Sequence, residues 1–278
     1  MSVAVEAVAV ADRRALSQIM RPVLALGTVL VAGAFVAFSP GGATPRAVPG
    51  EPALDGPTGP ELAPMAAADT SRDRTGPVRI ALQAGHWRAA EAPDEQAGLR
   101  ANGTRAAGVA EWEVNLAIAT RAARLLEDAG YEVEILPTTI PPAYRADLFI
   151  SIHADGNPNT TVSGYRAAAP RRDRTGLASD FAALLNSEYG AVTGLPFYPT
   201  LTRRMTSYYA FNSRRYTHAL DPATPGVILE TGFLTSPRDR RVIVDAPERA
   251  AAGIVAAVLK FLPPPVVADA SEPGDRSP

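Results

Sequence analysis

The sequence contains no cysteine, few histidines and almost no lysine. Among its 278 residues there are no cysteines and three histidines, and Lys260 is the only lysine. The absence of cysteine excludes disulfides, thiolate metal sites and a cysteine nucleophile. A metal site in this chain would therefore need histidine and carboxylate ligands.

A surplus of charge of either sign is also missing. The formal net charge is −2, with 27 basic and 29 acidic residues. No basic stripe is present that could neutralise phosphates, so we expect no nucleic acid partner. The hydrophobic content of 46% is sufficient for a sizeable core, and the length allows one domain of ordinary size plus additional segments.

An apolar run near the N-terminus has the pattern of an export signal. Residues 23–38 are preceded by Arg13, Arg14 and Arg21 and followed by a turn-forming Ser-Pro-Gly-Gly stretch. The run is shorter than the ~20 residues of a comfortable membrane-spanning helix. We therefore predict that residues 1–40 are a signal peptide or an N-terminal membrane anchor, the only part that contacts a membrane, and that the rest lies outside the cytoplasm. The alternative, a buried core helix, is disfavoured by the positive flank.

Two further segments lack a sustained apolar period. Residues 41–76 are rich in proline, glycine, alanine and aspartate, and residues 263–278 have a similar composition. Such segments cannot bury enough apolar surface to offset the entropy lost on ordering. We predict a disordered linker, a disordered tail and, between them, one folded catalytic domain over residues 77–262, which we expect to be a monomer.

Hydrophobic periodicity predicts alternating strands and helices in this domain. The predicted strands are 78–82, 131–136, 147–153, 164–167 and 227–230. The predicted helices are 113–129, 180–189 and 248–262. This alternation indicates an α/β fold, a three-layer sandwich with a mostly parallel central sheet flanked by helices.

Metal-binding side chains fall at the ends of three predicted strands. His86 follows the first strand, His153 ends the third, and Glu230 ends the last. In open α/β sheets the carboxyl ends of the strands form the edge where ligands bind. Either histidine alone could be satisfied by hydrogen bonds at a strand end. Their joint occurrence with Glu230 favours a metal site at this edge.

Two histidines need a third protein ligand if a catalytic zinc ion is to keep one position open for water. Without cysteine, that ligand should be a carboxylate. Glu111 and Glu113 both lie at the start of the first predicted helix. Either could instead be a first-turn carboxylate favoured by the helix dipole, and spacing alone does not choose between them.

Four blocks of local sequence occur together in this domain. They are Gly-His at 85–86, Glu-Trp-Glu-Val-Asn-Leu at 111–116, Ala-Asp-Leu-Phe-Ile-Ser-Ile-His-Ala-Asp at 146–155, and Pro-Gly-Val-Ile-Leu-Glu-Thr-Gly-Phe-Leu-Thr-Ser at 225–236. These blocks resemble the zinc-dependent N-acetylmuramoyl-L-alanine amidases in their order, their spacing and their local sequence. The resemblance extends over nearly the whole domain. The resemblance implies one zinc ion bound by His86, Glu111 and His153, with Glu113 as the weaker candidate. It also implies that Glu230 is the catalytic residue.

The reaction implied by this resemblance is hydrolysis of the amide bond between N-acetylmuramic acid and L-alanine in peptidoglycan. A zinc-activated water would be the nucleophile, and Glu230 would act as general base and then general acid. A different exported zinc hydrolase, such as a carboxypeptidase, would use the same ligand set. A non-catalytic cell-wall binding domain with the same fold is the other alternative.

The chain also departs from the family pattern, and two of the departures concern the turn at His86 and a missing helix. The first block usually reads Asp-Pro-Gly-His-Gly-Gly, whereas residues 83–88 read Gln-Ala-Gly-His-Trp-Arg, so we expect the turn and any carboxylate that supports His86 to differ. Only residues 138–146 stand where the family carries a helix between its second and third strands. We predict that this helix is absent.

An aromatic and basic stretch, residues 208–218, precedes the last strand. Its tyrosines could line a groove for sugar or peptide, and an arginine could bind a peptide carboxylate through two hydrogen bonds. We predict substrate-binding roles for Asn212, Arg214 and His218. The alternative is a loop whose tyrosines cover the sheet and whose arginines are solvated. His218 is not expected to be a fourth metal ligand, because that would close the site.

Overall fold

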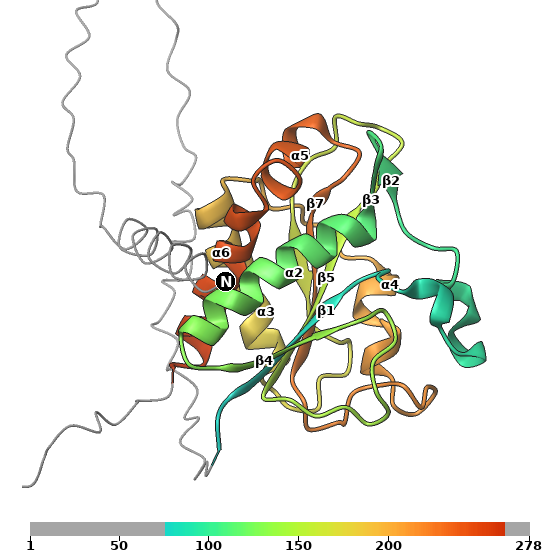
Figure 1. The fold of residues 1–278 in the computed structure, drawn as a ribbon, viewed down its shortest axis with the longest axis vertical. Helices are drawn as coiled ribbons and strands as arrows, with labels where there is room; N and C mark the ends of the chain where they lie inside the picture. Colours follow the sequence, from blue (N-terminus) through green and yellow to red (C-terminus); the bar gives the residue numbers. More distant parts are fainter. Residues whose placement is uncertain (1–75, 265–278) are drawn as a thin grey trace, which may run out of the picture. The chain divides into compact units, whose positions relative to one another are not determined.

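The computed structural model describes residues 76–264, which are built on a five-stranded sheet (Figure 1). The strands are β1 (Arg79–Ala84), β4 (Glu132–Leu136), β5 (Leu148–Asp155), β6 (Arg166–Ala168) and β7 (Gly226–Phe233). Their order is β4-β1-β5-β7-β6; the first four are parallel, and β6 is antiparallel to β7. The predicted α/β fold with a mostly parallel sheet is confirmed.

The long helices cover one face of this sheet. They are α2 (Glu111–Asp128), α3 (Ala178–Thr193) and α6 (Pro247–Phe261), and α6 packs against the other two. Because side chains alternate along a strand, every second residue of β1 and β5 points to these helices. Ile80, Leu82, Ile150 and Ile152 belong to this main core.

The opposite face is covered by loops and two short helices. Ala81 and Phe149 point to this side, where they pack in a second cluster with Ile140, Tyr209 and Leu220. The short helices are α4 (Arg203–Thr206) and η3 (Tyr209–Phe211). The connection between β4 and β5 contains no helix, as the departure from the family pattern predicts. The second covering layer is therefore made mainly of connections.

Helix boundaries differ from the predicted ones where capping decides them. The first helix begins at Glu111, because the carboxylate of Glu113 accepts a hydrogen bond of 2.7 Å from the amide of Ala110 and closes the helix start. Helix α3 runs to Thr193 and ends at Gly194, whose φ of 69° is the left-handed conformation that glycine adopts at helix ends.

Several short elements have no counterpart in the sequence prediction. They are η1 (Ala89–Glu91), η2 (Asp94–Leu99), the hairpin of β2 (Arg105–Ala106) with β3 (Val109–Ala110), and α5 (Pro237–Ile243). Each is too short to produce a readable hydrophobic period. In α5 the side chain of Ser236 caps the helix start and Pro237 occupies its first turn, which is a favoured combination.

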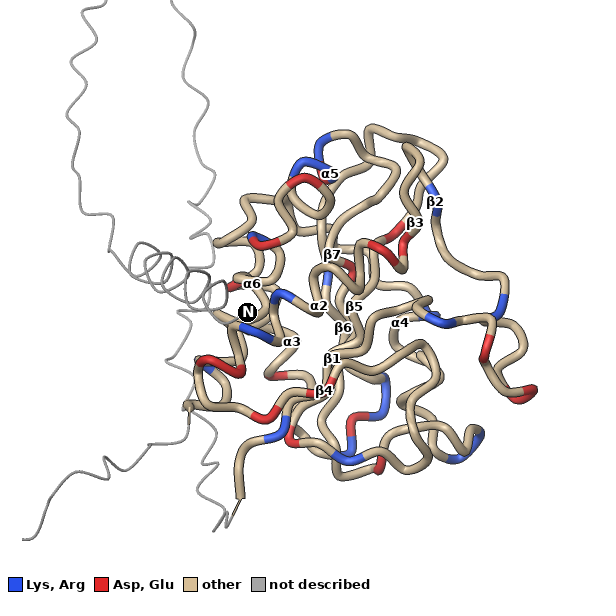
Figure 2. The backbone as a smooth tube through the Cα atoms, viewed as in Figure 1, with Lys and Arg blue, Asp and Glu red and all other residues tan. Residues whose placement is uncertain are grey.

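The predicted signal or anchor segment and nearly all of the predicted linker and tail lie outside the described residues, so the domain boundaries stay a prediction. Between residues 76 and 264, no helix combines the length and the apolar character needed to span a bilayer. Basic and acidic residues are interspersed along the described backbone (Figure 2).

Candidate active site

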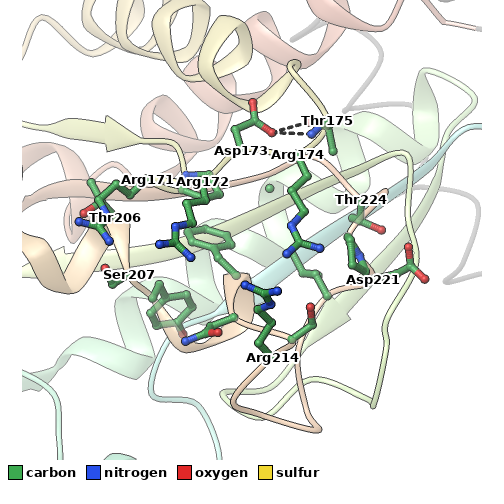
Figure 3. A pocket seen from close by; sticks show the side chains of 18 residues that line it. Arg171, Arg172, Asp173, Arg174, Thr175, Thr206, Ser207, Arg214, Asp221 and Thr224 are labelled. Carbon is green, nitrogen blue, oxygen red and sulfur yellow. Dashed lines mark hydrogen bonds between the residues drawn. The ribbon is translucent and has the colours of Figure 1, made fainter.

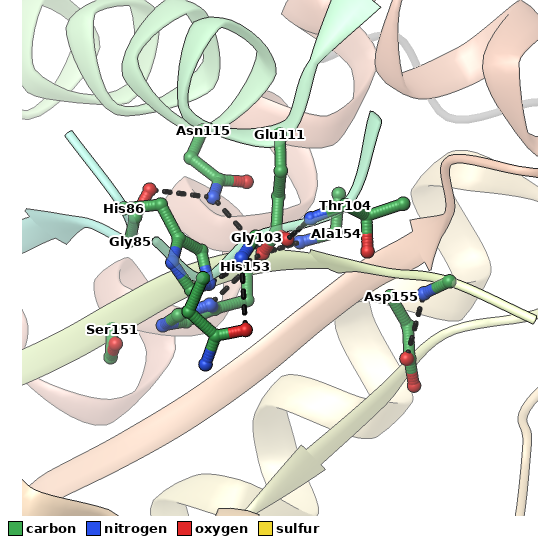
Figure 4. A network of polar contacts seen from close by, with 12 residues as sticks. Gly85, His86, Gly103, Thr104, Glu111, Asn115, Ser151, His153, Ala154 and Asp155 are labelled. Carbon is green, nitrogen blue, oxygen red and sulfur yellow. Dashed lines mark hydrogen bonds and ion pairs between the residues drawn. The ribbon is translucent and has the colours of Figure 1, made fainter. Parts of the chain in front are cut away.

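His86, Glu111 and His153 converge at the carboxyl ends of β1 and β5 (Figure 4). One ligand atom from each lies within 4.8 Å of the others. Oε1 of Glu111 is 3.4 Å from Nε2 of His86 and 3.1 Å from Nδ1 of His153. Two imidazole nitrogens and one carboxylate oxygen facing a common point form a donor set that suits a catalytic zinc ion.

The backbone places His86 through a constrained turn. His86 has a φ of 62°, which is uncommon for a residue with a side chain. A Cβ atom at Gly85 would lie 2.4 Å from the ring of His153, so glycine alone fits there. Nδ2 of Asn115 donates a hydrogen bond of 2.9 Å to the carbonyl of Gly85. The turn is therefore fixed by both the helix and the facing histidine.

The structure separates the two glutamates at the start of α2. Glu111 is buried, and its carboxylate accepts hydrogen bonds from the amides of Thr104 at 2.7 Å and Ala154 at 3.2 Å. Glu113 instead caps the helix and is exposed. Glu111 is thus the one that lies against both histidines.

Burial and mutual charge set the protonation of the three groups. Burial lowers the pKa of His86 to about 4, with a further contribution from His153, so its imidazole is neutral near pH 7. Burial alone would raise the pKa of Glu111, but His153 and His86 outweigh it and hold it at about 2. Burial opposes charge on His153 as well, yet the Glu111 carboxylate raises the pKa of this histidine. The cluster therefore presents an ionised carboxylate between two imidazoles.

Glu230 lies beside this cluster on the next strand. It is the register partner of His153 on β5 and of Arg166 on β6. Its Oε2 is buried and has no hydrogen-bond partner among the described residues. Burial raises the pKa of Glu230 to about 8; His153 opposes this effect, and the carboxylates of Asp155 and Glu111 add to it. A buried carboxyl group with a free oxygen is suited to proton transfer.

A buried ion pair borders Glu230 and was not predicted from the sequence. The guanidinium of Arg166 contacts the Asp155 carboxylate and the carbonyl of Thr200. It also lies over the rings of Tyr198 and Phe233, 5.0 and 5.8 Å from their centroids. The only sequence signal was an arginine inside a short predicted strand.

A second unpredicted network lies behind His153. Gln83, in the position where the family usually has aspartate, is fully buried. Its Oε1 accepts hydrogen bonds from Ser151 at 2.6 Å and Tyr208 at 3.0 Å, and its Nε2 donates to the carbonyl of Thr138 at 2.7 Å. The Tyr208 hydroxyl also lies 3.4 Å from Nε2 of His153. The glutamine thereby connects a loop, two strands and one of the two histidines.

The three predicted substrate-binding residues do not form one group. Nδ1 of His218 lies 2.7 Å from Oε1 of Glu95 in η2, and His218 is not part of the His86, Glu111 and His153 cluster. Asn212 and Arg214 instead line a separate pocket of about 230 Å³ (Figure 3). The structure therefore associates Asn212 with Arg214, and His218 with Glu95.

Comparison with known proteins agrees with the four sequence blocks. Residues 80–260 match the family profile described as N-acetylmuramoyl-L-alanine amidase. Among solved structures, the amidase Ami1 from Mycobacterium smegmatis is similar with a TM-score of 0.50 and 19% identity, over 66% of this chain and 96% of that one. The amidase AmiC2 of Nostoc punctiforme gives a TM-score of 0.48 and 19% identity, over 67% of this chain and 98% of that one. No curated protein sequence matches the chain.

Proposed function

Because this chain belongs to the N-acetylmuramoyl-L-alanine amidase family, we propose that it cleaves the bond between N-acetylmuramic acid and L-alanine with the help of one zinc ion. The proposed ligands of this ion are His86, Glu111 and His153. Family membership makes the chain an amidase of peptidoglycan. The metal, the ligand set and the role of Glu230 are the proposed part.

The observation that supports this proposal most is the position of Glu230. Its unpartnered Oε2 is buried on the strand next to His153, beside a cluster of three potential zinc donors. A buried carboxyl group without a partner is costly, so such groups are retained mainly where they take part in chemistry. A structural carboxylate would be expected to have hydrogen-bond donors around it, as Glu111 has.

Zinc bound at these donors would polarise the amide carbonyl and make a water molecule acidic enough to attack near neutral pH. The protein supplies the remaining steps. The charge of a bound zinc ion would favour the ionised form of Glu230, which would accept the proton of the attacking water at Oε2 and deliver it to the departing amine of L-alanine. The ionised carboxylate of Glu111 supplies negative charge at the metal position, and the neutral imidazole of His86 supplies a nitrogen lone pair.

Two predicted substrate residues are retained in the proposal. Asn212 and Arg214 line the pocket of Figure 3 and are proposed to contact the substrate there. His218 is engaged by Glu95, so for this residue the substrate role rests on the sequence pattern alone. We further propose that the enzyme acts outside the cytoplasm, where peptidoglycan lies, after export through residues 1–40.

Digestion of purified peptidoglycan, followed by mass spectrometry of the soluble products and by zinc analysis of the protein, tests this function. We expect about one zinc ion per chain and the release of peptides that begin with L-alanine. Release of terminal amino acids alone would show that the enzyme cleaves the bond of a carboxypeptidase substrate and would contradict the proposed amidase cleavage. A protein that bound peptidoglycan, contained no zinc and released no cleavage products would support a purely wall-binding role.

A further inference from the structure

A pocket of about 230 Å³ lies between residues 170–175 and residues 206–214, on the loop-covered face of the sheet. Its lining includes four arginines: Arg171, Arg172, Arg174 and Arg214. Figure 3 shows the guanidinium groups of Arg172, Arg174 and Arg214 pointing from two separate loops toward the same space. We call this site the arginine pocket.

These four arginines have no anionic partner in the part of the chain that the structure describes. The two carboxylates of the lining are occupied elsewhere. Asp173 accepts hydrogen bonds from Thr175 and from the amide of Ala178 at 2.9 Å, and Asp221 pairs with Arg145 at 2.9 Å. Arginine stays charged at every physiological pH, and the two aspartates of the lining offset at most two of the four charges, so the pocket keeps a net positive charge.

The arginine pocket is a close neighbour of the active site. Tyr208 lines the pocket, and its hydroxyl lies 3.4 Å from Nε2 of His153. Gly226 of the lining and Glu230 are four residues apart on β7, which corresponds to about 13 Å along a strand. An extended peptide of about four residues covers the same length.

We propose that the arginine pocket binds carboxylate groups of the peptidoglycan stem peptide, on the side of L-alanine that leaves with the peptide. This inference rests on the proposed function and names the part of the substrate that the enzyme recognises. A guanidinium binds a carboxylate through two parallel hydrogen bonds, and several of them around one cavity select a peptide with more than one carboxylate. The cavity is smaller than a typical pocket for a drug-sized ligand, which favours the end of a peptide over a disaccharide.

Calorimetric titration of the full chain with a synthetic stem tripeptide, and with the same tripeptide amidated at its carboxyl groups, tests the binding directly. We expect the carboxylate form to bind at least tenfold more tightly. In the double variant Arg174→Gln, Arg214→Gln this preference should be lost, since each charged contact contributes about a factor of ten. Arg124→Gln is the matched control, because Arg124 is an exposed arginine of α2 on the opposite face of the sheet.

Equal affinity for the two tripeptides, or an unchanged preference in the double variant, would overturn the proposal. So would a preference for a phosphate-bearing wall polymer over the tripeptide in the same titration. Circular dichroism and zinc content should match wild type in the double variant. A variant that lost either would be replaced by Arg172→Gln alone, in which the preference should fall by about tenfold.

Kinetics separate this proposal from the proposed function. On soluble muramoyl peptides the double variant should raise KM about tenfold with kcat within about twofold of wild type, and amidation of the peptide should abolish the difference. A wild-type protein that cleaves no muramoyl peptide yet prefers the carboxylate tripeptide would contradict the amidase mechanism and leave the pocket assignment standing.

Discussion

The hydroxyl of Tyr208 lies 3.4 Å from Nε2 of His153. The direction of the hydrogen bonds follows from Gln83, whose Nε2 faces the carbonyl of Thr138 and must donate to it. Oε1 of Gln83 then accepts from Tyr208, and the tyrosine oxygen is free to accept from His153. With a proton on Nε2, His153 would offer the lone pair of Nδ1, the nitrogen that faces Glu111, to the proposed zinc ion.

Tyr208→Phe should therefore weaken zinc binding while the fold is retained. Residues that orient a metal-binding histidine typically change metal affinity by about 10- to 100-fold, and we expect the lower end, because the contact is long. Competition with a zinc chelator measures this. Tyr144→Phe is the control, since its hydroxyl donates to Glu134 away from the site. An equal loss in both variants would mean that Tyr208 acts through general packing.

Glu230→Gln should keep zinc and lose activity. The amide preserves the size of the side chain but cannot accept the water proton, and loss of such a group typically lowers the rate by about 10²- to 10⁴-fold. Zinc content and product release from peptidoglycan are the two measurements. Glu113→Gln is the matched control and should retain both properties. Retained activity in Glu230→Gln would exclude this residue from proton transfer.

The stability of the metal-free protein should depend on pH through Glu230. Burial raises the pKa of its carboxyl group from 4.5 to about 8 in the folded state. The folded state therefore holds this proton more tightly than the unfolded state. The associated stability is present below about pH 4.5 and is lost as the pH rises toward 8.

Glu230→Gln removes this dependence, because an amide does not ionise in this range. Between pH 5 and pH 8 the free energy of unfolding should fall more steeply for wild type than for the variant. Urea denaturation in the presence of a chelator at both pH values measures the difference. Parallel pH profiles for the two proteins would show that the buried carboxyl group is not protonated in this way.

Removing one partner of the ion pair between Arg166 and Asp155 should lower the stability of the fold strongly. Arg166→Met leaves Asp155 without its partner, and removing one member of a buried pair costs roughly 3–5 kcal/mol. We expect about 3 kcal/mol here, because the Asp155 side chain is 22% exposed. The double variant Arg166→Met, Asp155→Asn should recover part of the loss in urea denaturation. No recovery would show that packing of Arg166 on Tyr198 and Phe233 is the larger contribution.

His86, His153 and Glu230 could be placed at one edge of the sheet from the sequence, because strand ends are readable from hydrophobic patterns. Glu111 could not be separated from Glu113 on that basis. Both occupy the first turn of α2, and what distinguishes them is the contact of Glu111 with residues on two other elements. The family resemblance made that choice, and the structure places Glu111 beside the histidines.

Other parts of the site depend on contacts that no local pattern contains. Gln83 and Tyr208 are 125 positions apart and meet only when the loop before β7 folds over the sheet. His218 lies against Glu95 from a segment with no hydrophobic period, so its actual partner could not be read from the sequence. Arg166 gives no local signal in the sequence, because a charged residue in a short strand is usually at the surface.

The separation of the long helices from the loop-covered face has a consequence for how this domain can change. Gln83, Ser151, His153 and Glu230 are attached to rigid strands, whereas the arginine pocket is formed largely by the connecting loops around them. Insertions and substitutions in such loops are tolerated far better than changes in a packed core. The residues that line the arginine pocket can therefore change without repacking the helical core or displacing His86, Glu111 and His153.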